Sequence, residues 1–224
     1  MKITTEAKVL RRRAPARNGV RGGSAVVEQA LRSIGDGDEL MILTDGSTSM
    51  IDFVRLLLDV VGPSDVSIAT WTMGIYDLEQ CEAFVADRRI RNMRMVVDPS
   101  IFGRRPELSA RLVRGFGVDA FRAANINAKF CTLRNGRFDI AVRSSMNLNP
   151  NRRIESADVS ACREVAAFYS GFVDRVFSAV AAGNQTQSES VFDRLFASDE
   201  AEAAPAMAAP RMRSLRSAIR RFAV

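Results

Sequence analysis

A small group of residues in the second half of the chain carries the side chains needed to hold a phosphate group. Lys129 supplies a compact positive charge, Ser145 a hydroxyl donor and Asn147 an amide donor. Besides Lys2 and Lys8, Lys129 is the single lysine in a chain whose other cations are all arginines. Charge-assisted hydrogen bonds from such donors contribute roughly 1.5–3 kcal/mol each when they are sheltered from water. The candidate phosphate-binding residues are Asn127, Lys129, Ser144, Ser145, Asn147 and Glu155.

The same group lacks the chemistry for cutting a phosphodiester. Cleavage needs a nucleophile and a proton donor for the leaving oxygen, and imidazole serves both tasks near neutral pH. The chain contains no histidine, and the amide of Asn127 cannot form a covalent intermediate. Strand alternation places Asn127, Lys129 and Cys131 on one face, but Cys131 is expected to be a small buried hydrophobe. The residues therefore favour phosphate binding without catalysis.

These residues occur in an order that resembles a known signature. Asn127-Ala-Lys129, a predicted hairpin, Ser144-Ser145-Met-Asn147 and then Glu155 are similar to the HxK…GSxN…E signature of the phospholipase D superfamily. In that family the histidine is the nucleophile, and the lysine, serine and asparagine hold the phosphate oxygens. The resemblance covers roughly residues 24–180 and implies a similar α/β fold.

The departures from that signature concern its catalytic positions. Asn127 stands at the nucleophile position, Ser144 replaces the glycine before the serine, and Arg134 falls where the family has an aspartate. The spacing from Lys129 to the serine pair is also longer than in the family pattern. As family enzymes need two copies of the motif, the single copy here implies a homodimer whose two motifs face each other across a twofold axis.

A purely structural role for the polar cluster is an open alternative. Ser and Asn side chains before a helix often cap it or form Asx-turns. Glu155 is well placed in sequence to bond the loop backbone and fix the end of the hairpin. Residual catalysis is the third alternative.

Strands that alternate with helices are expected to position these residues. Asn135-Gly136 between two apolar runs predicts a hairpin turn. Near-continuous apolar runs predict buried strands, and the periodic segments between them predict helices. The expected strands are 39–44, 66–71 and 93–97, and the expected helices are 24–34, 50–61, 77–88, 107–116 and about 157–181. The fold class is therefore α/β, with a mixed, mainly parallel sheet flanked by helices on both faces.

Composition divides the chain into four parts. Residues 1–23 are expected to form a basic flexible arm, 24–181 the α/β domain, 182–210 an acidic Ala/Pro-rich linker, and 211–224 a basic amphipathic helix. Residues 1–22 carry seven cations and one anion, and residues 211–224 carry five arginines. Basic ends of this kind meet nucleic acid or an acidic protein surface, or merely aid solubility. The candidate contact residues are Arg11, Arg12, Arg13, Arg213, Arg216, Arg220 and Arg221.

Cysteine spacing and the lengths of the apolar runs indicate the compartment in which the protein is expected to act. Three widely spaced cysteines (Cys81, Cys131 and Cys162) argue against a disulfide framework and suit a reducing cytoplasm. Without histidine or paired cysteines a zinc site is not expected, and no other cofactor is expected. No apolar run reaches the roughly 18 residues of a membrane span, and no signal peptide is expected.

Three functions follow from these observations. The first is a non-catalytic phospholipase D-like homodimer that binds the phosphates of DNA or RNA. The second is a scaffold or assembly protein that recruits protein partners through its tails, chiefly the carboxyl-terminal helix. The third is a phosphodiesterase completed by a partner chain that supplies a histidine.

Overall fold

A computed structural model describes residues 17–149 and 152–183 of the chain. Within these residues one eight-stranded sheet runs in the order β1-β2-β8-β7-β6-β3-β4-β5. The strands are β1 (Arg17–Gly22), β2 (Glu39–Thr44), β3 (Ser64–Thr70), β4 (Ile90–Val97), β5 (Phe121–Ala123), β6 (Lys129–Arg134), β7 (Ile140–Ser144) and β8 (Glu155–Ser160). The helices are α1 (Ser24–Arg32), α2 (Met50–Val61), α3 (Ile75–Ala86), α4 (Ser100–Arg104), α5 (Pro106–Phe116) and α6 (Arg163–Ala179), with a 3₁₀ turn at Val118–Ala120.

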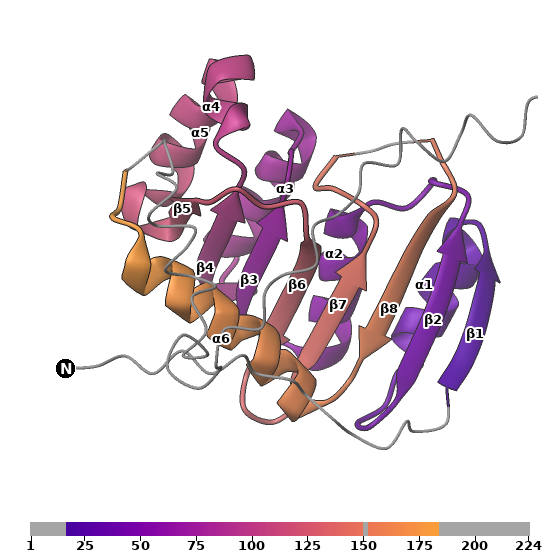
Figure 1. The fold of residues 1–224 in the computed structure, drawn as a ribbon. Coiled ribbons are helices and arrows are strands. Elements are labelled where there is room, and N and C mark those ends of the chain that lie inside the picture. The colour runs from indigo at the N-terminus through magenta and orange to yellow at the C-terminus, as the bar shows by residue number, and fades with distance from the viewer. Residues whose placement is uncertain (1–16, 150–151, 184–224) are drawn as a thin grey trace, which may run out of the picture.

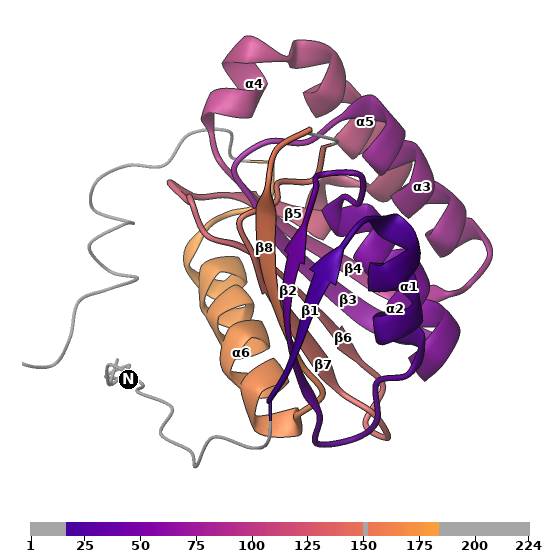
Figure 2. The same ribbon diagram turned by 90° about the vertical axis from the view of Figure 1, so that its right-hand side faces the viewer.

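Helices cover the sheet on both faces, which confirms the predicted α/β class. Figure 2 shows α6 alone on one side of the sheet and α1, α2 and α3 on the other. The larger core lies on the α1–α3 side and includes Phe53, Leu57 and Ile68, all fully buried. On the opposite face Val173 and Val176 of α6 pack against Phe130 and other apolar residues of the sheet.

The sheet is mixed, as expected, but parallel pairs are not in the majority. Among the described strands, β1–β2, β3–β4 and β4–β5 pair in parallel. The β2–β8, β3–β6, β6–β7 and β7–β8 pairs are antiparallel. The antiparallel share is larger than predicted because β8, which the sequence did not reveal, enters the sheet between β2 and β7 (Figure 1).

Two segments differ from the sequence predictions. The sequence predicts that residues 17–22 belong to a flexible arm, yet they form β1. This strand pairs with β2 from Arg17↔Glu39 to Gly22↔Thr44. The helix expected from about residue 157 begins instead at Arg163, because residues 155–160 are extended in β8. The remaining residues of the predicted basic arm, the linker and the terminal amphipathic helix lie outside the described residues.

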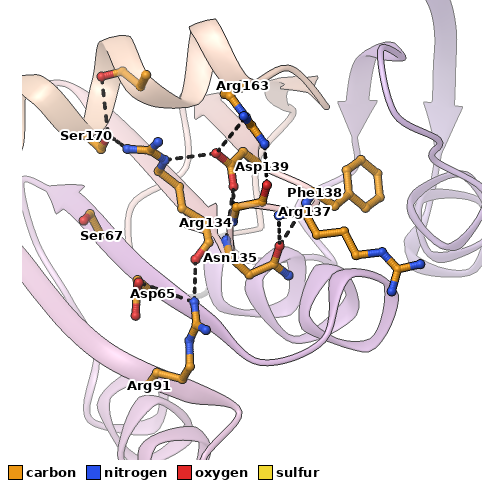
Figure 3. A network of polar contacts seen from close by, with 12 residues as sticks. Asp65, Ser67, Arg91, Arg134, Asn135, Arg137, Phe138, Asp139, Arg163 and Ser170 are labelled. Carbon is orange, nitrogen blue, oxygen red and sulfur yellow. Dashed lines mark hydrogen bonds and ion pairs between the residues drawn. The ribbon is translucent and has the colours of Figure 1, made fainter.

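The Asn135-Gly136 turn is present and opens a loop of five residues between β6 and β7. Gly136 has φ of 81°, a left-handed conformation that glycine adopts without strain. The Asn135 Oδ1 accepts the backbone N–H groups of Arg137 and Phe138, both at 2.9 Å. The buried Asp139 accepts the N–H groups of Asn135 and Gly136, both at 3.1 Å (Figure 3). Local side-chain bonds therefore fix the hairpin loop.

Candidate functional site

All six predicted phosphate-binding residues lie at one end of the central strands, at or just beyond the start of β6, the end of β7 and the start of β8. We call this end of the sheet the Lys129 edge. Lys129 begins β6, Ser144 ends β7 and Glu155 begins β8, and these three strand ends lie side by side along the upper side of the sheet in Figure 1. Lys129 lies directly opposite Ser144 in the antiparallel register. The ends of β2 and β3 and the starts of α2 and α3 lie at the same edge, because each helix follows its strand after a short connection.

The ammonium group of Lys129 is held by the residue at the predicted nucleophile position. Its Nζ donates to the Asn127 Oδ1 at 2.6 Å and to the Asn127 backbone carbonyl at 2.8 Å. Asn127 is exposed and Lys129 half-buried. The asparagine thus orients the lysine, and the third N–H of the ammonium has no partner among the described residues.

The two serines tie β7 to β8. The Ser144 hydroxyl donates to the Ser156 carbonyl at 2.9 Å and accepts the Met146 N–H at 2.8 Å. The Ser145 hydroxyl donates to the Glu155 carboxylate and accepts the Ser156 N–H at 2.9 Å. Both hydroxyl protons are therefore engaged within the protein, and an incoming phosphate would have to replace these acceptors.

Asn147 precedes a residue that is bonded to the end of β3 and the loop that follows it. Its neighbour Leu148 accepts the Gly74 N–H at 2.7 Å and donates to the Thr70 Oγ1 at 3.2 Å. The Asn147 Oδ1 is buried and has no hydrogen-bond partner among the described residues. A buried unpartnered oxygen is costly, so this amide is a polar group that a ligand or water would satisfy.

The sequence did not reveal a buried carboxyl group at the same edge. Asp77, in the first turn of α3, is fully buried, and its Oδ1 accepts the Ser49 hydroxyl at 3.4 Å. Its other oxygen has no hydrogen-bond partner among the described residues. Burial, with a smaller contribution from the nearby Asp52 carboxylate, raises the pKa of Asp77 to about 6. The residue type and its position near a helix start are common, so no sequence signal marked Asp77 as buried.

Cys131 has the environment expected of a core residue. It is completely buried on the α1–α3 side of the sheet, and desolvation raises the pKa of its thiol to about 12. A thiol of this kind stays protonated and is a poor nucleophile. Cys81 and Cys131 are buried free thiols, and Cys162 is partly exposed.

Exposed aromatic and basic side chains border the site. Trp71 follows β3 and is 38% exposed, with the Arg104 guanidinium 4.4 Å from its ring centroid. Tyr76, at the start of α3, is 54% exposed, and Arg152 and Arg153 are exposed in the segment before β8. The edge therefore combines cations with flat aromatic surfaces. The predicted contact residues Arg11–Arg13 and Arg213–Arg221 lie outside the described residues.

The described residues contain neither a metal-binding group nor a membrane-spanning helix. No group of three or more Cys, Asp or Glu side chains in residues 17–149 and 152–183 is arranged to hold a metal ion. In the same part of the chain, no helix has the length and apolar character that crossing a membrane requires.

The fold is similar to solved structures that include a phospholipase D family member and a chromatin protein. Nuc from Salmonella typhimurium, a phospholipase D family member, aligns at 11% identity over 64% of this chain and 96% of its own, with a TM-score of 0.47. NucT from Helicobacter pylori aligns at 14% identity over 64% and 99%, with a TM-score of 0.43. The archaeal chromatin protein TrmBL2, whose structure shows a mode of DNA binding, aligns at 10% identity over 63% and 54%, with a TM-score of 0.42.

Neither a scan of the sequence against protein-family models nor a search of curated proteins finds a match. The described residues have the mixed α/β arrangement that was expected from the Lys129 motif.

Proposed function

We propose that this protein binds the phosphates of nucleic acid at the Lys129 edge of the sheet, as a homodimer and without cutting the polymer. The observation that carries the proposal is the Lys129 ammonium, which Asn127 holds by two hydrogen bonds at the position where the related signature has its nucleophile. A fixed cation with a donor to spare binds a phosphate oxygen. With no histidine in the chain, the site lacks the group that would attack the phosphorus.

The surroundings of Lys129 favour a polymer as the ligand. Tyr76 offers an exposed ring on which a base stacks, and stacking of this kind tolerates any sequence. Trp71 is also partly exposed, with the Arg104 guanidinium over its ring. The exposed Arg152 and Arg153 add positive charge for the backbone. Single-stranded nucleic acid, whose bases are free to stack, is therefore the preferred form.

The test is a fluorescence anisotropy titration of the full chain with labelled single- and double-stranded DNA across a salt series. We expect Lys129→Ala to weaken single-strand binding by about 5- to 30-fold, the loss of one partly exposed charge-assisted bond. The slope of log affinity against log salt should fall by about 0.7, the contribution of one phosphate contact to a single strand.

Arg114→Gln is the matched control, because Arg114 is an exposed cation in the last turn of α5, which supplies none of the residues of the Lys129 site. Equal binding by Lys129→Ala and the parent would overturn the proposal and favour the scaffold function. Turnover of the DNA by the purified parent, lost in Lys129→Ala, would instead favour a phosphodiesterase.

A further inference from the structure

A second polar site lies at the other end of β6, on the face of the sheet that α6 covers. It is an open cavity of about 490 Å³ whose walls carry the guanidinium groups of Arg91, Arg94 and Arg134. The carboxylates in the walls are those of Asp65 and Asp174, which pair with Arg91 and Arg94 respectively. A cavity of this volume falls in the range of sites for small molecules.

The register of three neighbouring strands builds the floor of this cavity. Thr132 of β6 pairs with Ser67 of β3, which pairs with Arg94 of β4. The next row toward the hairpin consists of Arg134, Asp65 and Asn92. Side chains two residues apart on a strand share a face, so both rows point to the α6 side.

The same face is apolar farther along the strands. Ala69, Val96 and Phe130 are buried under the valines of α6. They stand two residues from Ser67, Arg94 and Thr132 respectively, on the same face. The change from apolar to polar side chains occurs on all three strands at one level, which marks the cavity as a distinct polar region.

The arginines are fixed by contacts that leave donors free. The Arg134 Nε donates to Asp139 at 3.2 Å and its Nη1 to the Ser170 hydroxyl at 2.9 Å (Figure 3). Its Nη2 has no partner among the described residues. Arg94 pairs with Asp174 and donates to the Ser67 hydroxyl at 3.3 Å. Arg91 uses only its Nη2, toward Asp65 at 3.4 Å and the Arg134 carbonyl at 3.2 Å.

One buried hydroxyl in the floor has no partner. Thr132 is 1% exposed, and its Oγ1 makes no hydrogen bond to any described residue. A buried hydroxyl without a partner costs stability, and native proteins rarely leave one. Thr132 therefore points to a missing acceptor at the base of a cavity lined by guanidinium groups.

We propose that this cavity binds a phosphate group, with Arg91, Arg94 and Arg134 supplying charge-assisted hydrogen bonds and Thr132 a hydroxyl donor. Planar guanidinium groups match the spacing of phosphate oxygens and bind them in pairs. The site is independent of the Lys129 edge, because Lys129 and Arg134 stand at opposite ends of β6.

The experiment is calorimetric titration of the full chain with inorganic phosphate in chloride-matched buffer, with a 5′-nucleoside monophosphate in a second arm. We expect saturable binding that Arg94→Gln and Thr132→Val each weaken by about 5- to 10-fold, whereas Arg114→Gln leaves it unchanged. If the nucleotide binds more tightly than phosphate, the rest of the cavity holds the sugar and base. If the two bind equally, the ligand is the phosphate alone.

Thr132→Val gives a second readout that does not depend on ligand affinity. Valine has the shape of threonine without the hydroxyl, so the free variant should melt about 1–4 °C above the parent, and phosphate should raise its melting temperature less. A free variant that melts at or below the parent temperature would show that the hydroxyl is already satisfied. Absence of saturable binding by the parent, or equal binding by Arg94→Gln, would also overturn the proposal, and neither result bears on DNA binding at Lys129.

Discussion

At the scale of single residues, Asp77 makes the clearest prediction about stability. Burial raises its pKa to about 6 in the folded protein, above its ordinary value. The folded state therefore binds this proton more tightly than the unfolded state does. The stability that this difference in proton affinity contributes is present at low pH and is lost as the pH rises through about 6. We expect Asp77→Asn to unfold at higher denaturant near pH 7, with a gain of roughly 1–3 kcal/mol that shrinks toward pH 4.

Urea titrations of Asp77→Asn and the parent from pH 4 to pH 8 measure this difference, and Asp45→Asn is the matched control. The pKa of Asp45 is lowered by the side-chain and backbone hydrogen bonds of Ser47, so this carboxylate stabilises the fold above its ordinary pKa and loses that effect in acid. Because Asp45 stays ionised from pH 4 to pH 8, the control should lose stability by an amount that changes little across this range. A gain for Asp77→Asn that does not change with pH would contradict the assignment.

The sequence predicted which residues would meet at the Lys129 edge but not how they would bond. Hairpin pairing brings Lys129 opposite Ser144, whereas a two-residue turn at Asn135-Gly136 would have paired Lys129 with Val142, because the loop between the strands has five residues. The bonds from Asn127 to Lys129 and from Ser145 to Glu155 depend on rotamers and on β8, which the sequence pattern did not reveal. Burial of Asp77 depends on Ser49 and the loop before α3, which only the folded chain brings together.

At the scale of elements, predictability followed the strength of the local pattern. The apolar run of β2 and the capped, apolar α2 have the predicted bounds, Glu39–Thr44 and Met50–Val61. β8 was missed because its Ala157, Asp158 and Val159 are equally compatible with a helix. Pairing with β2 and β7, which are distant in sequence, makes the segment extended. β1 has a single apolar residue other than glycine, Val20, and owes its strand conformation to β2.

Because β1 is a strand, its removal should destabilise the domain. A chain that begins at residue 24 loses six in-register residue pairs and the contact of Val20 with the core, and it leaves the β2 edge unpaired. Compared with a chain that begins at residue 17, we expect a loss of about 2 kcal/mol in the free energy of unfolding. Chemical denaturation followed by circular dichroism measures this difference, and coincident curves would show that β1 contributes nothing.

At the scale of the whole molecule, exposed apolar side chains near the Lys129 edge are candidates for the interface of the proposed dimer. Ile154 is 82% exposed immediately before Glu155, and Ile75 is 41% exposed at the same edge. A second copy related by a twofold axis and docked at this edge would bury these two side chains. We expect sedimentation equilibrium to give twice the chain mass of 24.6 kDa, and Ile154→Asp to weaken association by about 10-fold or more.

Val118→Asp is the control for this measurement, because Val118 is 42% exposed in the 3₁₀ turn beside β5, away from the Lys129 edge. A monomeric parent at all concentrations would remove the dimer from the proposal. A dimer that Ile154→Asp does not weaken would place the interface on another surface.

The position of β8 also governs the order in which the chain can assemble. β2 and β3 follow each other in sequence, yet β8, β7 and β6 lie between them in the sheet. The flank made by β1 and β2 therefore has no partner strand in the rest of the domain until residues 155–160 have been synthesised. Contacts of such long sequence separation carry a large loop-closure cost and slow folding. During translation, one hydrogen-bonding side of β2 therefore stays unpaired until β8, more than a hundred residues later in the chain, has been synthesised.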